Sequence, residues 1–524
     1  MKTLNYILGI LAISATITSC VGDLKVTPID PNANTADKAL VDEASFQSFL
    51  AGVYLGFATS GYYGANGSAS ISGLDGGASQ YIRGLYHHSE LTTDESVCGW
   101  NDQTIKNFHY MNWTTDDSFI YAFYSRIFMQ VGMANEFIRE AKASEVDFAA
   151  KQELIDEARL LRAIAYYHAI DNFGNVPFAD ETAIVGQNPD QISRADLYKW
   201  LETELLDLVN NSKLPAKGAT TSRASKGAAQ FLLAKLYLNA GVYTGTDAYE
   251  KCADVLKTLI NSGTYSLHTT SAGTYPAYQE LFLADNNLCG DEIIFAVEQD
   301  GVNTTSYGAT NYIIFASTGG EMDPDVMGIS SGWGGLRMTP EFYNKFSDGD
   351  ARKLFYTATN KADIDDIGEF TNGYGFMKFR NRTSTGGYGK EKGFVDTDFP
   401  MMRYADVLLM AAECELRGKA VDGYAGYKAV RTRAGLSATA PASLDELLDE
   451  RARELYQECW RRNDLIRFGW FTSGDAKHLW QWKGNVKEGK GVDKGRELFP
   501  IPDSDLLANT KLQQNEYYKT STAE

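Results

Sequence analysis

The chain has 524 residues, and its 49 lysines and arginines against 68 aspartates and glutamates give a formal net charge of −19. A surface this acidic repels phosphate backbones, which argues against a nucleic-acid-binding protein. The hydrophobic fraction of 44% and the charged fraction of 22% are those of a globular protein, so a disordered or fibrous chain is excluded.

The first twenty residues predict an export signal. Residues 1–20 contain an early lysine, a short apolar run and small residues that end in Cys20. The run is too short to span a bilayer, so it predicts a cleaved signal peptide. Residues 17–20, Ile-Thr-Ser-Cys, resemble a bacterial lipobox. We therefore expect residues 1–19 to be removed and Cys20 to carry lipid; an ordinary signal peptide with an incidental cysteine is the alternative.

Apolar residues spaced three and four apart predict a series of helices. In residues 153–170, for example, Leu154, Ala158 and Leu161 lie on one face. Further helices are expected over residues 44–57, 117–142, 194–210, 225–239, 247–261, 402–417, 423–434 and 443–467. Such helices, joined by short loops, suit an array of tetratricopeptide-like helix pairs. Because no clean repeat of about 34 residues is evident, a non-repetitive helical domain is the alternative.

Glycine content separates the helical regions from a loop-rich one. Residues 101–200 hold three glycines and residues 301–400 hold sixteen, and glycine is costly in helices and permissive in turns. Apolar runs over residues 292–297 and 312–316 predict short strands within the loops. The expected organisation is a signal peptide (1–19), a tether (20–43), a helical region (44–270), a loop-rich ligand-binding region with short strands (271–398) and a C-terminal helical region (399–524).

Arginines are interleaved with acidic residues near the C-terminus. Residues 450–467 contain five arginines and four acidic residues, many of them three or four positions apart. This spacing predicts ion pairs within one helix and no basic nucleic-acid patch.

Five segments together resemble the SusD/RagB family of outer-membrane glycan-binding lipoproteins. They keep the family's order and are spread over nearly the whole mature chain: residues 156–177, 225–243, 399–413 (FPMMRYADVLLMAAE), 450–468 (ERARELYQECWRRNDLIRF) and 498–518. The resemblance implies a mainly α-helical fold with four tetratricopeptide-like helix pairs. It also implies a lipid-anchored position on the outside of the outer membrane, above a SusC-like TonB-dependent transporter that receives the bound oligosaccharide.

A site for a neutral oligosaccharide needs exposed aromatic planes for the sugar faces and a few polar partners for the hydroxyls. Such rings belong on loops that a rigid scaffold holds. Trp100, Tyr307 and Trp333 lie beside glycine or polar residues outside the helical patterns. They are therefore the candidate stacking rings, and burial of each ring under a loop is the alternative.

The resemblance points to the same loops. Tyr307 and Trp333 match two rings of the aromatic arc in starch-binding members, and Arg83 matches a polar contact. Cys98 stands where those members have a tryptophan, with Trp100 two residues later and Asn101 beside it. The predicted carbohydrate-binding residues are thus Arg83, Trp100, Asn101, Tyr307 and Trp333. The departure at Cys98 puts starch itself in doubt and leaves glycan binding in place.

Asp396 and Asp398 offer two carboxylates two residues apart, and calcium prefers such oxygen ligands. In an extended segment their side chains share a face, and Asp285 or Asn287 are expected to add ligands. Solvated acidic side chains are the alternative. No other cofactor is expected.

We expect a binding protein and no enzyme. A glycoside hydrolase is the main alternative, because it needs only two suitably placed carboxylates and the chain has many. A protein-interaction scaffold that binds no glycan is the second, because helix-pair arrays often serve that purpose.

Overall fold

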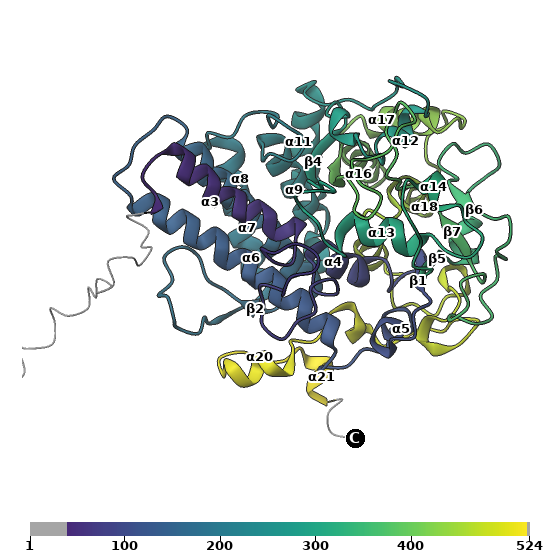
Figure 1. Ribbon diagram of the computed structural model, residues 1–524, viewed down its shortest axis with the longest axis horizontal. Helices are drawn as coiled ribbons and strands as arrows, with labels where there is room; N and C mark the ends of the chain where they lie inside the picture. The colour runs from purple at the N-terminus through teal and green to yellow at the C-terminus, as the bar shows by residue number, and fades with distance from the viewer. Residues whose placement is uncertain (1–38, 521–524) are drawn as a thin grey trace, which may run out of the picture.

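Helices that pack against one another in pairs are the main structural feature of the protein (Figure 1). The computed structural model describes residues 39–520. The predicted signal peptide, Cys20 and the tether up to residue 38 lie outside the described residues. Within residues 39–520, no helix is both long and apolar enough to cross a membrane.

The N-terminal helices confirm the predicted pattern. They are α3 (Glu43–Ala58), α6 (Ser118–Ala143), α7 (Lys151–Asn172), α8 (Arg194–Asn210), α9 (Lys226–Leu238), α10 (Ala240–Thr244) and α11 (Tyr249–Asn261). Side-chain caps set several starts: Asp117 accepts hydrogen bonds from the first amides of α6, and Ser225 accepts one from α9. Such caps satisfy amides that have no partner within the helix. α6 packs on α7, and α9 packs on α8 and α11.

The C-terminal helices include one correction. They are α16 (Tyr404–Leu416), α17 (Gly423–Arg433), α18 (Leu444–Leu455) and α19 (Arg461–Arg467). The prediction of one helix over residues 443–467 is wrong, because Gln457 and Cys459 adopt left-handed backbone conformations with φ of 60° and 67°. The amide of Gln457 donates to Glu95 instead, over 2.6 Å. This long-range contact redirects the chain between α18 and α19.

Short elements complete the chain. They are α4 (Tyr81–Ser89), α5 (Gln103–Tyr110), α12 (Ala277–Glu280), η1 (Asn286–Leu288), α13 (Ala309–Ser317), α14 (Pro324–Met327), α15 (Pro340–Tyr343), η2 (Ala476–His478), η3 (Lys483–Asn485), η4 (Lys494–Glu497), α20 (Asp503–Ala508) and α21 (Glu516–Thr520). The strand expected over residues 312–316 is wrong, because this run lies in α13. All nine residues of α13 are buried, so the run has no polar face to reveal a helical period.

Over residues 39–520, three small antiparallel sheets lie among the helices. The first has the order β1-β5-β7-β6, the second pairs β4 with β8, and the third pairs β2 with β3. Their strands are β1 (Ser96–Cys98), β2 (Val176–Pro177), β3 (Gln191–Ile192), β4 (Ile293–Val297), β5 (Leu336–Met338), β6 (Phe355–Tyr356), β7 (Tyr374–Phe376) and β8 (Phe399–Arg403). β4 confirms the strand expected over residues 292–297. Its pairing with β8 joins the loop-rich region to the C-terminal helices.

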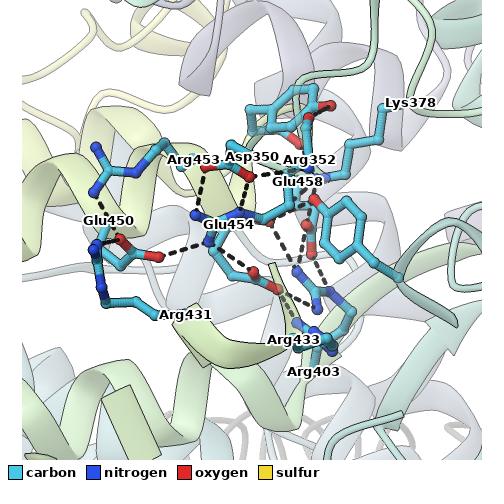
Figure 2. Close-up of polar contacts among 12 residues, drawn as sticks. Asp350, Arg352, Lys378, Arg403, Arg431, Arg433, Glu450, Arg453, Glu454 and Glu458 are labelled. Carbon is cyan, nitrogen blue, oxygen red and sulfur yellow. Dashed lines mark hydrogen bonds and ion pairs between the residues drawn. The ribbon is translucent and has the colours of Figure 1, made fainter. Parts of the chain in front are cut away.

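A buried ion network replaces most of the intrahelical pairs that the arginine spacing predicts (Figure 2). Arg403 of β8 bonds Glu454 of α18 and Glu458 of the loop after it, with all three side chains essentially inaccessible. Arg352 bonds Glu450 and Glu454 in the same way. Removing one partner of a buried ion pair is strongly destabilising, so this network holds α18 against strands and loops from distant parts of the chain.

Candidate functional site

Two tryptophans meet because two short strands pair. Cys98 of β1 lies opposite Leu336 of β5 in antiparallel register. The loop that leaves β1 and the loop that enters β5 therefore share one edge of the sheet. Trp100 lies on the first loop and Trp333 on the second, and the Trp100 Nε1 donates to the Trp333 carbonyl over 3.1 Å. Their ring centroids are 6.3 Å apart at 49°.

A glycine makes room for this contact. A Cβ at Gly335 would lie 2.8 Å from the Trp100 ring, closer than carbon atoms approach. The amide of Gly99 also donates to the carbonyl of Gly335 over 3.0 Å. The glycines around Trp333 thus let the two loops close on each other.

Tyr307 adds a third ring from the loop between β4 and α13. Its centroid lies 6.1 Å from that of Trp333, at an interplanar angle of 58°. Trp333 also rests on Phe315 of α13 at 4.9 Å. Trp100 and Trp333 are half-buried, and Tyr307 is 37% exposed. We call Trp100, Tyr307 and Trp333 the ring cluster; it is a row of three tilted rings.

Arg83 of α4 packs against Trp100 of the ring cluster, and within residues 39–520 its Nε has no hydrogen-bond partner. Its guanidinium carbon is 4.6 Å from the Tyr312 ring centroid and 5.4 Å from that of Trp100. The residue is 9% exposed, its Nε is buried and unbonded, and no carboxylate within residues 39–520 forms an ion pair with it. Burial lowers its pKa from the ordinary value. Because buried donors are costly when unsatisfied, this group is poised to donate to a ligand.

Two residues beside Trp100 complete the comparison with the sequence: Cys98, where a tryptophan of the aromatic arc is missing, and Asn101, a predicted binding residue. Cys98 is 2% exposed within β1, so its side chain forms no wall of the site, and Trp100 supplies the ring beside Trp333. Asn101 is exposed next to Trp100, and its Oδ1 accepts from Lys106 Nζ over 2.8 Å.

Four residues on or beside loops that contact the ring cluster were not predicted from the sequence. The Tyr307 hydroxyl donates to Asn66 Oδ1 over 3.0 Å, and the ring of Phe394 lies 5.5 Å from that of Tyr307. Tyr62 and Tyr63, four and three residues before Asn66, are 77% and 84% exposed. These two tyrosines are flanked by Gly61 and Gly64, so the rule that selected Trp100 and Trp333 would also have found them.

The predicted calcium ligands line a separate pocket of about 420 Å³. Asp396 Oδ1 accepts from the Gly301 amide over 2.8 Å, and Asp398 Oδ1 accepts from the Gln299 amide over 2.8 Å. Burial raises the pKa of Asp398 to about 8. Asp285 lines the same pocket and accepts from Ser384. Over residues 39–520, no group of three or more His, Cys, Asp or Glu side chains is arranged to hold a metal ion.

Comparison with known families matches two parts of the chain. Residues 352–518 match the family described as the SusD family. Residues 74–238 match the family described as starch-binding and associating with the outer membrane. The second match contains Arg83 and Trp100.

Curated relatives extend the likeness over the whole chain. The chain is 30% identical to the starch-binding protein SusD of Bacteroides thetaiotaomicron, over 97% of this chain and 98% of that protein. It is 26% identical to the SusD-like protein P2 of Formosa agariphila, over 76% of this chain and 81% of that protein.

Solved structures share the fold. A SusD homologue of Bacteroides thetaiotaomicron superposes with a TM-score of 0.71 at 22% identity, covering 92% of this chain and 98% of that one. The surface glycan-binding protein A of the same organism, in complex with laminarihexaose, superposes with a TM-score of 0.69 at 18% identity, covering 91% and 100%.

Proposed function

The chain belongs to the SusD family, and on that premise we propose that it is a non-catalytic protein of the cell surface that binds a neutral glucan at the ring cluster. The observation that carries this proposal is the unpaired guanidinium of Arg83. The Arg83 Nε is buried without a hydrogen-bond partner, and no carboxylate within residues 39–520 forms an ion pair with the guanidinium. A folded protein tolerates such a group where a ligand supplies the acceptor. The hydroxyl oxygens of a sugar are such acceptors.

The ring cluster would supply the apolar half of recognition. Trp100, Trp333 and Tyr307 follow one another at centroid distances of 6.3 and 6.1 Å, so successive sugar units can each meet a ring face. The rings are tilted by 49° and 58° to each other. A tilted row fits a chain that curves, such as a starch-like α-glucan, better than a flat chain. The shape of the site would thus select the glycosidic linkage. Stacking on the rings and hydrogen bonds from Arg83 would provide the affinity.

We further propose that the protein holds its glycan for a SusC-like TonB-dependent transporter. Two observations support this proposal. The Ile-Thr-Ser-Cys sequence at residues 17–20 resembles a lipidation site, and a lipid on Cys20 would keep the protein at the membrane surface. The family that matches residues 74–238 is described as associating with the outer membrane.

Calcium at the acidic pocket stays a prediction. Asp396 and Asp398 line one pocket with Asp285. At least one oxygen of each of these carboxylates, however, already accepts a hydrogen bond from a backbone amide. No part of glycan recognition depends on this ion. Calcium should raise the melting temperature of the wild type relative to EGTA, and Asp398→Asn should remove the difference; equal melting temperatures in calcium and EGTA would reject the site.

The direct test is an affinity gel with a panel of polysaccharides and the purified mature protein. We expect amylopectin to retard the protein, and we expect no reducing ends after prolonged incubation with it. Release of reducing ends would favour the glycoside hydrolase. Unretarded migration with every polysaccharide of the panel would favour the protein-interaction scaffold and reject glycan binding.

A further inference from the structure

Two exposed tyrosines stand beside the ring cluster. Tyr62 and Tyr63 are 77% and 84% exposed, and within residues 39–520 neither ring has a hydrogen bond or a ring contact. Contact of an aromatic ring with water is unfavourable, so covering the ring with a ligand lowers the free energy. We propose that Tyr62 and Tyr63 form an additional sugar-binding subsite that extends the ring cluster along a longer α-glucan. This inference rests on the proposed function of the ring cluster.

Contacts with the ring-cluster loop place the two tyrosines there. The Tyr307 hydroxyl donates to Asn66 over 3.0 Å, and the amide of Ala65 donates to Thr305 Oγ1 over 3.3 Å. A Cβ at Gly64 would lie 2.7 Å from the same Thr305 oxygen, so the backbone after Tyr63 touches the loop that carries Tyr307. The backbone that directly follows the two tyrosines therefore contacts the loop that carries the third ring of the cluster.

The loop that carries them has a fixed base. Arg126 of α6, which is 3% exposed, donates to the carbonyls of Ser60 and Ser79 over 2.7 and 2.6 Å. It also donates to Ser70 Oγ over 2.8 Å. Burial lowers the pKa of Arg126 to about 10. One guanidinium thus joins both ends and the middle of the loop, which we call the Arg126 loop (residues 60–80).

The tip of the Arg126 loop is folded tightly around Tyr63. A Cβ at Gly67 would lie 2.4 Å from the Tyr63 Cβ, and Gly64 has φ of +70°. Only glycine takes both positions without strain. The rings are therefore presented by a backbone that is ordered before a ligand arrives, which lowers the entropy cost of binding.

The test compares maltotriose with maltoheptaose by isothermal titration calorimetry. The variant Tyr62→Ala/Tyr63→Ala should bind maltoheptaose about five- to tenfold more weakly than the wild type and maltotriose equally well, because only the longer chain reaches beyond the ring cluster. Tyr62→Phe/Tyr63→Phe keeps the ring faces and should retain wild-type affinity for both. Ile184→Ala/Val185→Ala is the matched control, because it removes two apolar side chains that are 66% and 75% exposed on another loop.

Each other result overturns the inference. Wild-type affinity of the alanine variant for both oligosaccharides would reject the subsite and leave the tyrosines to a protein partner. An equal loss of affinity for maltotriose and maltoheptaose would show that the Arg126 loop affects the ring cluster itself and adds no subsite for a longer chain. Weak binding by the phenylalanine variant would reject stacking. If the wild type binds neither oligosaccharide, both the proposed function and the additional subsite are rejected.

Discussion

Replacement of Trp333 by alanine separates ligand binding from stability. The side chain is half-buried and touches the rings of Trp100, Tyr307 and Phe315. Its backbone bonds, from its amide to the Phe315 carbonyl and from Trp100 to its own carbonyl, involve no side-chain atom of Trp333. The change thus removes one ring face and keeps the loop connections.

The expected effect on Kd is large, and the expected effect on Tm is small. Loss of a ring face that a sugar covers should cost about 1.5–3 kcal/mol of binding free energy, which is about 10- to 100-fold in Kd. Loss of a half-buried ring should cost about 1–2 kcal/mol of unfolding free energy. In a chain of this size that lowers the Tm by only a few degrees, at roughly 2–4 °C per kcal/mol or less.

Calorimetry measures both quantities on the same sample. Titration with maltoheptaose gives Kd, and scanning calorimetry gives Tm. Trp470→Ala is the matched control, because Trp470 is also half-buried and stacks on His478 at 3.7 Å on an element that carries no ring of the cluster. Equal Kd in Trp333→Ala and the wild type would refute the assignment of Trp333, as would an equal loss in Trp470→Ala.

Three further changes test other parts of the structure. Arg83→Met should weaken maltoheptaose binding about tenfold without lowering Tm, because it removes a buried cation that has no partner; a lower Tm with unchanged Kd would make Arg83 structural. Burial raises the pKa of Asp398 to about 8, above its value of about 4 in the unfolded chain. Between about pH 4 and pH 8 the carboxyl group is therefore protonated in the folded state and ionised in the unfolded state, so the free energy of unfolding falls as the pH rises across this range. Asp398→Asn should therefore gain on the order of 3 kcal/mol relative to wild type from pH 5 to pH 8, and a constant difference in urea unfolding would contradict the raised pKa. Arg403→Met should lower the free energy of unfolding by about 3–5 kcal/mol, because it leaves buried glutamates unpaired. The more exposed ion pair of Arg139 with Glu136 on α6 should contribute under about 1 kcal/mol, so similar losses in Arg403→Met and Arg139→Met would argue against the network.

Helix positions were predictable because their signals are local. The helix expected over residues 194–210 coincides with α8, and that over residues 44–57 with α3 to within one residue at each end. Apolar spacing and end caps depend only on the residues of one segment, so they are visible in the sequence itself. The prediction failed at α13, where complete burial removes the polar face on which the period depends.

The arginine-rich segment shows where local spacing stops being informative. Spacings of three and four permit ion pairs within a helix, and Arg453 forms one with Glu450. Arg461, however, bonds Asp94, which is 367 residues away in the chain. Partners this distant are chosen by the packing of whole elements, so the spacing of the arginines could not reveal them.

The candidate site divides in the same way. The sequence by itself determined which rings lie on glycine-rich loops, because a ring beside glycine or polar residues and outside an apolar helical pattern is a local signal. Only the tertiary structure decided that Trp100 and Trp333, 233 residues apart, share one edge through the pairing of β1 with β5. It also decided that no carboxylate among residues 39–520 forms an ion pair with Arg83, since pairing depends on every group that surrounds a side chain, and those neighbours are known only once the chain has folded.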